Sequence, residues 1–354
     1  MSVFEELNEI QKIDKGNMYK AVSGFPDQMK DAVTIAEGFS VDTSKYEGIT
    51  RIVLCGMGGS AIGGDFVKSL LADELTIPFE VCRDYTLPNY CDQNTLVIGS
   101  SYSGNTEETL AAFKTAIEKG CRLFVLTTGG QLEALAKKHG IPVVKPREGF
   151  QPRAALSYSF TLLLLFCNKI GLTTYGSDAL NAAAKFLKQR IQFFSIDNPI
   201  ESCLTKQLAE KLVGRVPIIY SGPGLTAPVA VRFAGQLSEN AKILAFSNQF
   251  PEFNHNQLVG YETADMYRDS IFVIVLRDKD DNQRVQKRMD IVEGLIAEKE
   301  IDVVEIESVG ETKLERVLSL VQVADFTSFY LAIKLGVDPT PVNPIEALKQ
   351  ALKG

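Results

Sequence analysis

The segment Ser101-Tyr102-Ser103-Gly104-Asn105-Thr106-Glu107-Glu108 decides which fold is predicted for this chain. It follows an apolar run at residues 95–100, typical of a buried strand, and precedes residues 109–114, which have helical spacing. It is therefore predicted to be a strand-to-helix turn. A tight turn at a glycine, side-chain hydroxyls and the positive end of a helix together suit a phosphate group. The hydroxyls are those of Ser101, Ser103 and Thr106.

An ordinary helix cap is the simpler interpretation of the same segment. In that case Ser103 or Asn105 is the N-cap, and Glu107 or Glu108 completes a capping box. The segment alone does not decide between a cap and a phosphate site.

A second glycine-rich turn follows the apolar run at residues 51–55. In this turn Gly58 and Gly59 allow a ligand to approach the backbone closely, and Ser60 adds a hydroxyl. As a dinucleotide fingerprint it is weak, because no acidic partner is clearly placed about 20 residues further on, and the Gly-Lys-Ser/Thr of a P-loop is missing. Two such turns after two strands instead indicate a single sugar-phosphate pocket.

Length and composition limit the classes of protein to which the chain can belong. The chain has 354 residues, of which 45% are hydrophobic, and a net charge of −7 with acids and bases interspersed. About two domains are expected, without a basic surface for nucleic acid or an anionic membrane. Six scattered cysteines without metal-ligand spacing, and an N-terminus without a signal-peptide pattern, predict a cytoplasmic protein with reduced thiols.

Strand and helix signals alternate from residue 49 onward, which predicts an α/β fold with two doubly wound parallel sheets. Residues 1–40 are predicted to form a helical N-terminal arm. Residues 41–175 are predicted to be a first domain that contains both turns. Residues 176–354 are predicted to be a second domain that ends in a helix.

The second domain is predicted to repeat the first. A strand at residues 216–221 is followed by Gly222-Pro223-Gly224, just as the run at residues 51–55 is followed by Gly56-Met57-Gly58, and this weak similarity suggests an internal duplication. A helix at residues 226–239 and a strand at residues 243–246 are expected next.

The two turns resemble the signature of the sugar isomerase (SIS) superfamily, which couples a Gly-Gly-Ser turn to Ser-x-Ser-Gly-x-Thr-x-Glu. Further segments resemble the narrower bifunctional phosphoglucose/phosphomannose isomerase family, and the resemblance extends from about Gly56 to Lys349. These segments are Ser238-Glu239-Asn240, Glu252-Phe253-Asn254-His255-Asn256, Gln151-Pro152-Arg153-Ala154, Asp338-Pro339-Thr340-Pro341-Val342 and Leu348-Lys349.

The resemblance implies two SIS domains and an aldose-ketose isomerase. Such an enzyme interconverts glucose 6-phosphate and mannose 6-phosphate with fructose 6-phosphate by proton transfer through a cis-enediolate, without a metal or another cofactor. A homodimer is also implied. The implied phosphate- and substrate-binding residues are Gly58, Gly59, Ser60, Ser101, Ser103, Thr106 and Arg153.

The resemblance also implies four catalytic roles. Glu239 is the base that moves the proton, and Arg153 stabilises the enediolate. His255 assists ring opening, either in its own chain or in the neighbouring subunit. Lys349 is a further acid/base residue near the ring oxygen, with Lys353 as the alternative.

Each of these residues has a plainer interpretation. Glu239 near a helix end, His255 in a loop and Lys349 on a helix face are all typical of solvated surface groups. Arg153 near a helix start is unfavourably placed relative to the helix dipole, which is mild evidence for an anionic partner. His139, the other histidine, is expected to be structural.

Two rival functions remain open from the sequence. A non-catalytic SIS sensor would bind a phosphosugar without turnover and would not need Glu239, although such sensors usually carry a DNA-binding module. Another SIS enzyme would act on an amino-sugar phosphate.

Overall fold

The computed structural model describes residues 7–352 and divides the chain into two compact units. The first unit is Gly24–Lys188, and the second unit combines the described part of residues 1–23 with that of residues 189–354. The helices of the predicted arm at residues 1–40 are thereby divided between the two units.

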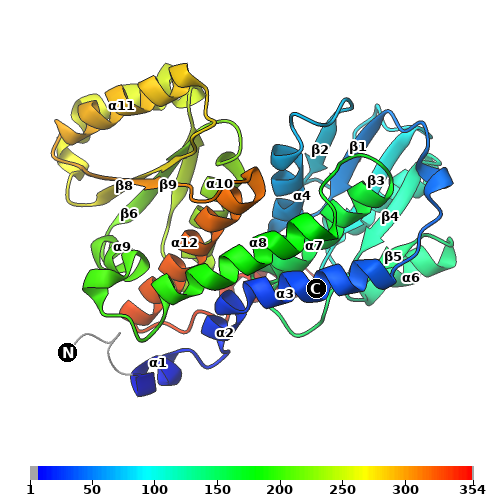
Figure 1. Cartoon of the computed structure of the whole chain (residues 1–354), viewed down its shortest axis with the longest axis horizontal. Helices are drawn as coiled ribbons and strands as arrows, with labels where there is room; N and C mark the ends of the chain where they lie inside the picture. The colour runs from blue at the N-terminus through cyan, green and yellow to red at the C-terminus, as the bar shows by residue number, and fades with distance from the viewer. Residues whose placement is uncertain (1–6, 353–354) are drawn as a thin grey trace. The chain divides into compact units, whose positions relative to one another are not determined.

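The first unit contains a five-stranded parallel sheet in the order β2-β1-β3-β4-β5 (Figure 1). All six residues of β3 are buried, because helices cover both faces of the sheet. The predicted alternation of strands and helices is confirmed. The strands are β1 (Arg51–Cys55), β2 (Phe79–Cys82), β3 (Thr95–Ser100), β4 (Arg122–Leu126) and β5 (Val143–Val144).

The helices of the first unit pack on its sheet through apolar side chains. In α3 the buried Met29, Ala32, Val33 and Ala36 recur at the helical spacing seen in the sequence, and α3 lies alongside α7 (Figure 1). The helices are α3 (Phe25–Gly38), α4 (Gly58–Leu70), α5 (Glu107–Glu118), α6 (Gly130–Lys138), α7 (Leu156–Lys169) and α8 (Ser177–Arg190), with the short 3-10 helices η2 (Thr43–Tyr46) and η3 (Pro152–Ala155).

The second unit contains a four-stranded parallel sheet in the order β7-β6-β8-β9. Its strands are β6 (Val216–Ser221), β7 (Phe246–Gln249), β8 (Ile271–Arg277) and β9 (Asp302–Glu307). Its helices are α1 (Leu7–Ile13), α2 (Met18–Ser23), α9 (Leu204–Leu212), α10 (Ala227–Ala241), α11 (Gln283–Ala297), α12 (Lys313–Lys334) and α13 (Asn343–Ala351), with η4 (Ile191–Phe194), η5 (Ile200–Ser202), η6 (Glu252–His255) and η7 (Gln257–Tyr267).

Helix α12 is the core helix of the second unit. Among the described helices it alone is long and apolar enough to cross a membrane, but 94% of its most apolar window is buried. It packs against α9 and α10 and carries buried side chains on all sides, so its apolar character is explained by its place in the core.

The two units share a topology. In each, the first strand lies between the second and the third, so β1 corresponds to β6 and β3 corresponds to β8. The carboxyl ends of β1 and β3 therefore form the switch point of the first sheet, and those of β6 and β8 form that of the second. This match is what the predicted internal duplication requires.

One predicted strand is wrong. The apolar run at residues 243–246 was expected to form it, but the strand is β7, and only Phe246 belongs to both ranges. Leu244 is 71% exposed and Phe246 is 54% exposed, so the run does not mark a buried strand. β7 is an edge strand whose residues after Phe246 are polar, and it pairs with β6 through its backbone.

Candidate active site

The two predicted turns lie side by side in the first unit. One follows β1 and the other follows β3, and these strands are neighbours that pair in parallel. Helix α4 begins at Gly58, inside the glycine-rich turn that follows β1 (the first turn), and α5 begins at Glu107, in the turn that follows β3 (the second turn). Ligands of open α/β sheets bind at such a switch point.

Direct hydrogen bonds join the two turns. The Ser60 hydroxyl oxygen accepts from the backbone N–H of Tyr102 at 3.0 Å, and the Ser60 carbonyl accepts from the Ser100 hydroxyl at 3.0 Å. α4 already begins at Gly58, within the glycine-rich stretch, so Ser60 lies in the first turn of this helix. The sequence obscured this start because glycines are poor helix formers.

The second turn is held by its own hydroxyls. Ser101 Oγ lies 2.9 Å from Thr106 Oγ1 and accepts from the Gly104 N–H at 3.1 Å. Gly104 has a φ of +68°, and a Cβ there would lie 1.8 Å from the Gly129 carbonyl oxygen, so only glycine fits. The Ser103 side chain is exposed, and its Oγ accepts from the Asn105 N–H at 3.3 Å.

The ordinary-cap interpretation of this turn is wrong. The N-cap of α5 is Thr106, and its side chain makes no capping hydrogen bond. Asn105 Oδ1 instead accepts from the Gln131 N–H at 3.1 Å. The N-cap of α4, Met57, also provides no side-chain cap. Two helix N-termini without side-chain caps therefore meet at this edge of the sheet, an arrangement that favours an anion.

Arg153 belongs to the same part of the first unit. It lies in η3 and is only 4% exposed, which overturns the surface-arginine interpretation; α7 begins three residues later, at Leu156. A Cβ on Gly59 would lie 2.7 Å from the Pro152 carbonyl oxygen and 3.0 Å from the Arg153 backbone nitrogen. Because Gly59 has no side chain, Pro152 and Arg153 can pack against the first helical turn of α4.

Glu239 lies in the last turn of α10 in the second unit and is half-buried. The next residue, Asn240, is fully buried and donates to the Ser328 hydroxyl at 2.9 Å. Earlier on the same helix, Arg232 and Gln236 both bind the buried carboxylate of Asp325 on α12. These contacts fix the rotation of α10 against α12.

His255 ends the 3-10 helix η6, not an irregular loop as predicted, and its side chain is exposed. The preceding Phe253 anchors η6, because it is fully buried with its ring centroid 4.3 Å from that of Tyr220. Asn254 Oδ1 accepts from Arg288 at 3.5 Å. His255 therefore occupies a defined position beyond the carboxyl end of β7.

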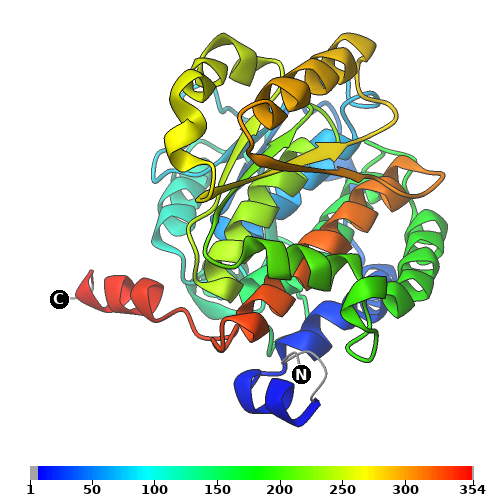
Figure 2. The same ribbon diagram turned by 90° about the vertical axis from the view of Figure 1, so that its left-hand side faces the viewer.

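Lys349 lies on α13, where every side chain from Asn343 to Gln350 is exposed. Figure 2 shows α13 extending away from the other helices of its unit. The segment before α13 is fastened beside Glu239, because Lys242 Nζ donates to the Glu239 carbonyl at 2.5 Å and to the Pro341 carbonyl at 2.6 Å. The alternative, Lys353, lies outside the described residues.

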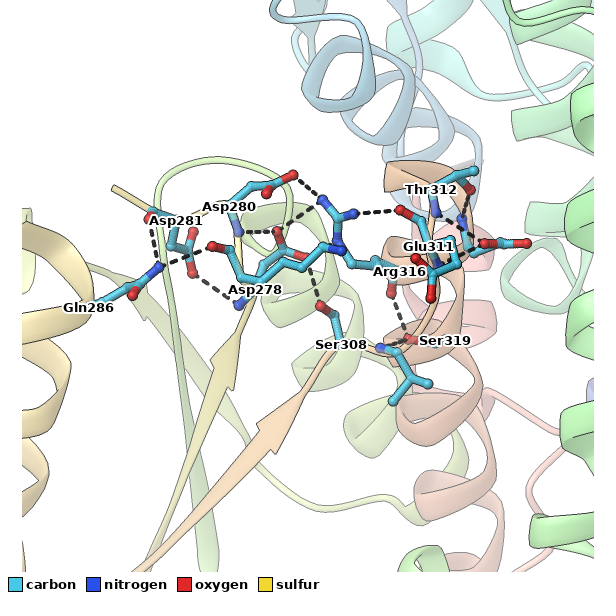
Figure 3. Close-up of polar contacts among 12 residues, drawn as sticks. Asp278, Asp280, Asp281, Gln286, Ser308, Glu311, Thr312, Arg316 and Ser319 are labelled. Carbon is cyan, nitrogen blue, oxygen red and sulfur yellow. Dashed lines mark hydrogen bonds and ion pairs between the residues drawn. The ribbon is translucent and has the colours of Figure 1, made fainter. Parts of the chain in front are cut away.

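The corresponding edge of the second sheet is occupied by ion pairs that sequence reasoning missed (Figure 3). The buried Arg316 of α12 donates to Asp278 at 2.8 Å and also pairs with Asp280. Burial alone would raise the pKa of Asp278, but hydrogen bonds from Arg316 and Ser308 outweigh it and hold the pKa below its usual value. The sequence feature that could have revealed these ion pairs is the group of acidic residues directly after the buried strand β8.

Comparison with known proteins places the chain among sugar-phosphate enzymes. Residues 202–352 match the family described as bacterial phospho-glucose isomerase C-terminal SIS domain. The chain is 42% identical over 335 residues to the bifunctional phosphoglucose/phosphomannose isomerase of Caldicellulosiruptor bescii, covering 95% of this chain and 98% of that protein. It is 34% identical over 247 residues to the D-glucosamine-6-phosphate 4-epimerase of Sulfolobus acidocaldarius, covering 69% of this chain and 74% of the relative.

A solved structure shares the fold. It is that of a hypothetical protein from Thermus thermophilus, with a TM-score of 0.73 and 16% identity, covering 94% of this chain and 90% of the other. The similarity to the Caldicellulosiruptor protein spans nearly the full length of both chains and therefore includes both units. The chain thus belongs to the bifunctional phosphoglucose/phosphomannose isomerase family.

Proposed function

We propose that this protein is an aldose-ketose isomerase that interconverts glucose 6-phosphate and mannose 6-phosphate with fructose 6-phosphate. The observation that carries the proposal is the 42% identity to the Caldicellulosiruptor enzyme over 98% of that enzyme's length. Glu239, His255, Arg153 and Lys349 supply the acid, base and cationic groups that such a reaction needs.

We propose that the substrate phosphate binds at the two joined turns of the first unit. Uncapped N-termini of α4 and α5 support this, because their N–H groups and dipoles favour an anion. The hydrogen bond between Ser60 and Tyr102 supports it further, because it holds the two turns together. The proposed phosphate ligands are Ser60, Ser101, Ser103 and Thr106, with Gly58 and Gly59 permitting close approach.

The proposed reaction moves one proton between two carbons. After the sugar ring opens, Glu239 removes the proton from C2 of the aldose, and the electron pair of the C–H bond forms the enediolate. Glu239 then returns the proton to C1, while the proton of the C2 hydroxyl passes to the C1 oxygen, which yields the ketose. Arg153 stabilises the negative charge on the enediolate oxygens, while His255 and Lys349 transfer the protons of ring opening. Glu239 is the base for both hexoses, because the planar enediolate does not retain the configuration at C2.

We further propose a homodimer in which His255 serves the active site of the neighbouring subunit. The positions of Glu239 and His255 before and after β7 support this arrangement. The substrates are hexose 6-phosphates, and no nucleic acid or membrane is proposed as a partner. Six free, buried cysteines support a reducing compartment, and we propose the cytoplasm.

An amino-sugar phosphate is the second candidate substrate. The 34% identity to a D-glucosamine-6-phosphate 4-epimerase is the specific observation that supports it. A coupled assay with glucose 6-phosphate, mannose 6-phosphate and glucosamine 6-phosphate decides between the candidates. Turnover of the first two, with fructose 6-phosphate as product, is expected. Turnover of glucosamine 6-phosphate alone would refute the isomerase proposal, and binding of all three without turnover would indicate a sensor.

A further inference from the structure

Tyr102, a residue of the second turn, contacts three other segments of the first unit. Its backbone N–H donates to Ser60 at 3.0 Å, and its carbonyl accepts from Thr128 Oγ1 at 2.7 Å. Its hydroxyl donates to the Arg147 carbonyl at 2.7 Å and accepts from the Phe150 N–H at 3.1 Å. Tyr102 is thus hydrogen-bonded to the first turn, to the β4–α6 connection and to the segment that leads to Arg153.

The segment between β5 and η3 is anchored at two places. The Tyr102 hydroxyl binds its backbone, and Asp31 of α3 binds the Arg147 side chain through two bonds of 2.9 Å each. Asp31 is itself held by the Tyr158 hydroxyl at 3.0 Å. From Phe150 the chain reaches Arg153 within three residues, so the position of the segment determines where the arginine backbone enters the site.

We propose that Tyr102 is a positioning residue for Arg153 in the isomerase reaction. This inference rests on the proposed function and on the enediolate role of Arg153. The hydroxyl fixes residues 147–150, which sets the place of Arg153 against Gly59. The contact there is already tight, as a Cβ on Gly59 would lie 2.7 Å from Pro152. A shift of the segment therefore displaces Arg153 outward, away from the first turn of α4.

Removing only the hydroxyl isolates this role. Tyr102→Phe keeps the ring and all backbone bonds but leaves the Phe150 N–H and the Arg147 carbonyl without that partner. Because the proposed role of Arg153 is to stabilise the enediolate and not to bind the phosphate, its displacement should lower kcat and leave KM nearly unchanged. We expect kcat to fall about 10- to 100-fold, since a misplacement of about 1 Å costs up to about 100-fold. KM for each hexose 6-phosphate should stay within about twofold.

Tyr46→Phe is the matched control. Tyr46 lies in the same unit, and its hydroxyl donates to the backbone carbonyl of Leu123 at 3.0 Å, away from both turns. It is expected to retain wild-type kcat and KM. If Tyr102→Phe does not fold, Asp31→Asn, which weakens the other anchor of the segment, takes its place with the same expected loss of kcat.

A double-mutant cycle with Arg153→Ala separates positioning from a general loss of structure. In the Arg153→Ala background, Tyr102→Phe should change kcat less than about twofold, because there is no guanidinium left to position. Multiplicative losses in the double variant, or wild-type kcat in Tyr102→Phe, would overturn the inference. An inactive wild type would refute the proposed function itself, and this result is distinct from either of these.

Discussion

Glu239 and His255 lie beyond opposite ends of the same strand. Glu239 lies in the last turn of α10, which runs back from the carboxyl end of β6, so it precedes the amino end of β7, whereas His255 follows the carboxyl end of β7. The four residues of β7 span about 13 Å at a rise of roughly 3.3 Å per residue. This placement at opposite ends of β7 is the reason for proposing that His255 serves the substrate of the neighbouring subunit rather than that of its own chain.

Subunit complementation tests the exchange of His255 between subunits. Glu239→Gln and His255→Ala homodimers should each be inactive or nearly so. When the two variants are mixed under conditions of subunit exchange, heterodimers form in which one site has both an intact Glu239 and the partner's intact histidine. We expect up to about one quarter of wild-type activity, since half of the dimers are mixed and each has one intact site. Proven exchange without recovery would place both residues in the same chain's site.

Glu239→Gln tests whether one base serves both hexoses. The amide keeps the shape of the side chain but cannot accept the C2 proton. Glucose 6-phosphate and mannose 6-phosphate turnover should therefore fall together by roughly 10²- to 10⁴-fold, with ligand binding largely retained. In deuterated water the wild type should place deuterium at C2 of recovered aldose, because the carboxyl proton exchanges with solvent. Loss of only one activity would contradict a shared enediolate.

The parallel sheets could be predicted because their signal is local. Buried strands such as β3 are continuous apolar runs, and the helices between them have helical spacing. The edge strand β7 could not be predicted in this way, because three of its four residues are polar while the exposed Leu244 precedes it. In both cases the apolar pattern of the sequence indicates which residues are buried, not which residues form a strand.

The parts of the candidate site that sequence reasoning missed depend on contacts between distant residues. The need for a glycine at Gly59 arises from Pro152, which comes from a different segment of the chain. The role inferred for Tyr102 likewise arises from Arg147 and Phe150. No local pattern contains such pairs, whereas the hydroxyls of Ser101 and Thr106 meet within one turn and were predictable.

Ser103→Ala tests the phosphate site. Ser103 is the exposed hydroxyl of the second turn, so its loss removes a proposed ligand contact without opening the part-buried Ser101–Thr106 pair. A hydrogen bond to a charged group contributes about 1.5 to 3 kcal/mol, so affinity for fructose 6-phosphate should fall about 10- to 150-fold. Ser44→Ala, an exposed serine of η2, is the control. Unchanged affinity in Ser101→Ala, Ser103→Ala and Thr106→Ala alike would place the phosphate elsewhere.

The pH dependence of stability is expected to depend on Glu293 of α11. Arg277 at the end of β8 binds Glu293 and Glu305 at 2.6 Å each. Burial and then a hydrogen bond with Glu305 raise the pKa of Glu293 to about 8, while the same hydrogen bond lowers the pKa of Glu305. The two carboxyl groups therefore share one proton in the folded protein near neutral pH.

The direction of the effect follows from proton binding. Between the ordinary glutamate pKa of about 4.5 and about 8, the folded protein holds a proton at Glu293 that the unfolded chain has released. The contribution of Glu293 to the free energy of unfolding is thus fully present below pH 4.5 and is lost as pH rises toward 8. Its slope is at most about 1.4 kcal/mol per pH unit, the value for one proton.

Glu293→Gln should remove this dependence, because the amide carries no titrating proton but can still donate to Glu305. Thermal unfolding of the wild type and the variant from about pH 5 to about pH 8 measures the difference. The Tm of the variant relative to wild type should rise steadily with pH over this range. Glu298→Gln, at an exposed position at the end of α11, should follow the wild-type curve throughout. Parallel curves for wild type and Glu293→Gln would show that the pair holds no shared proton.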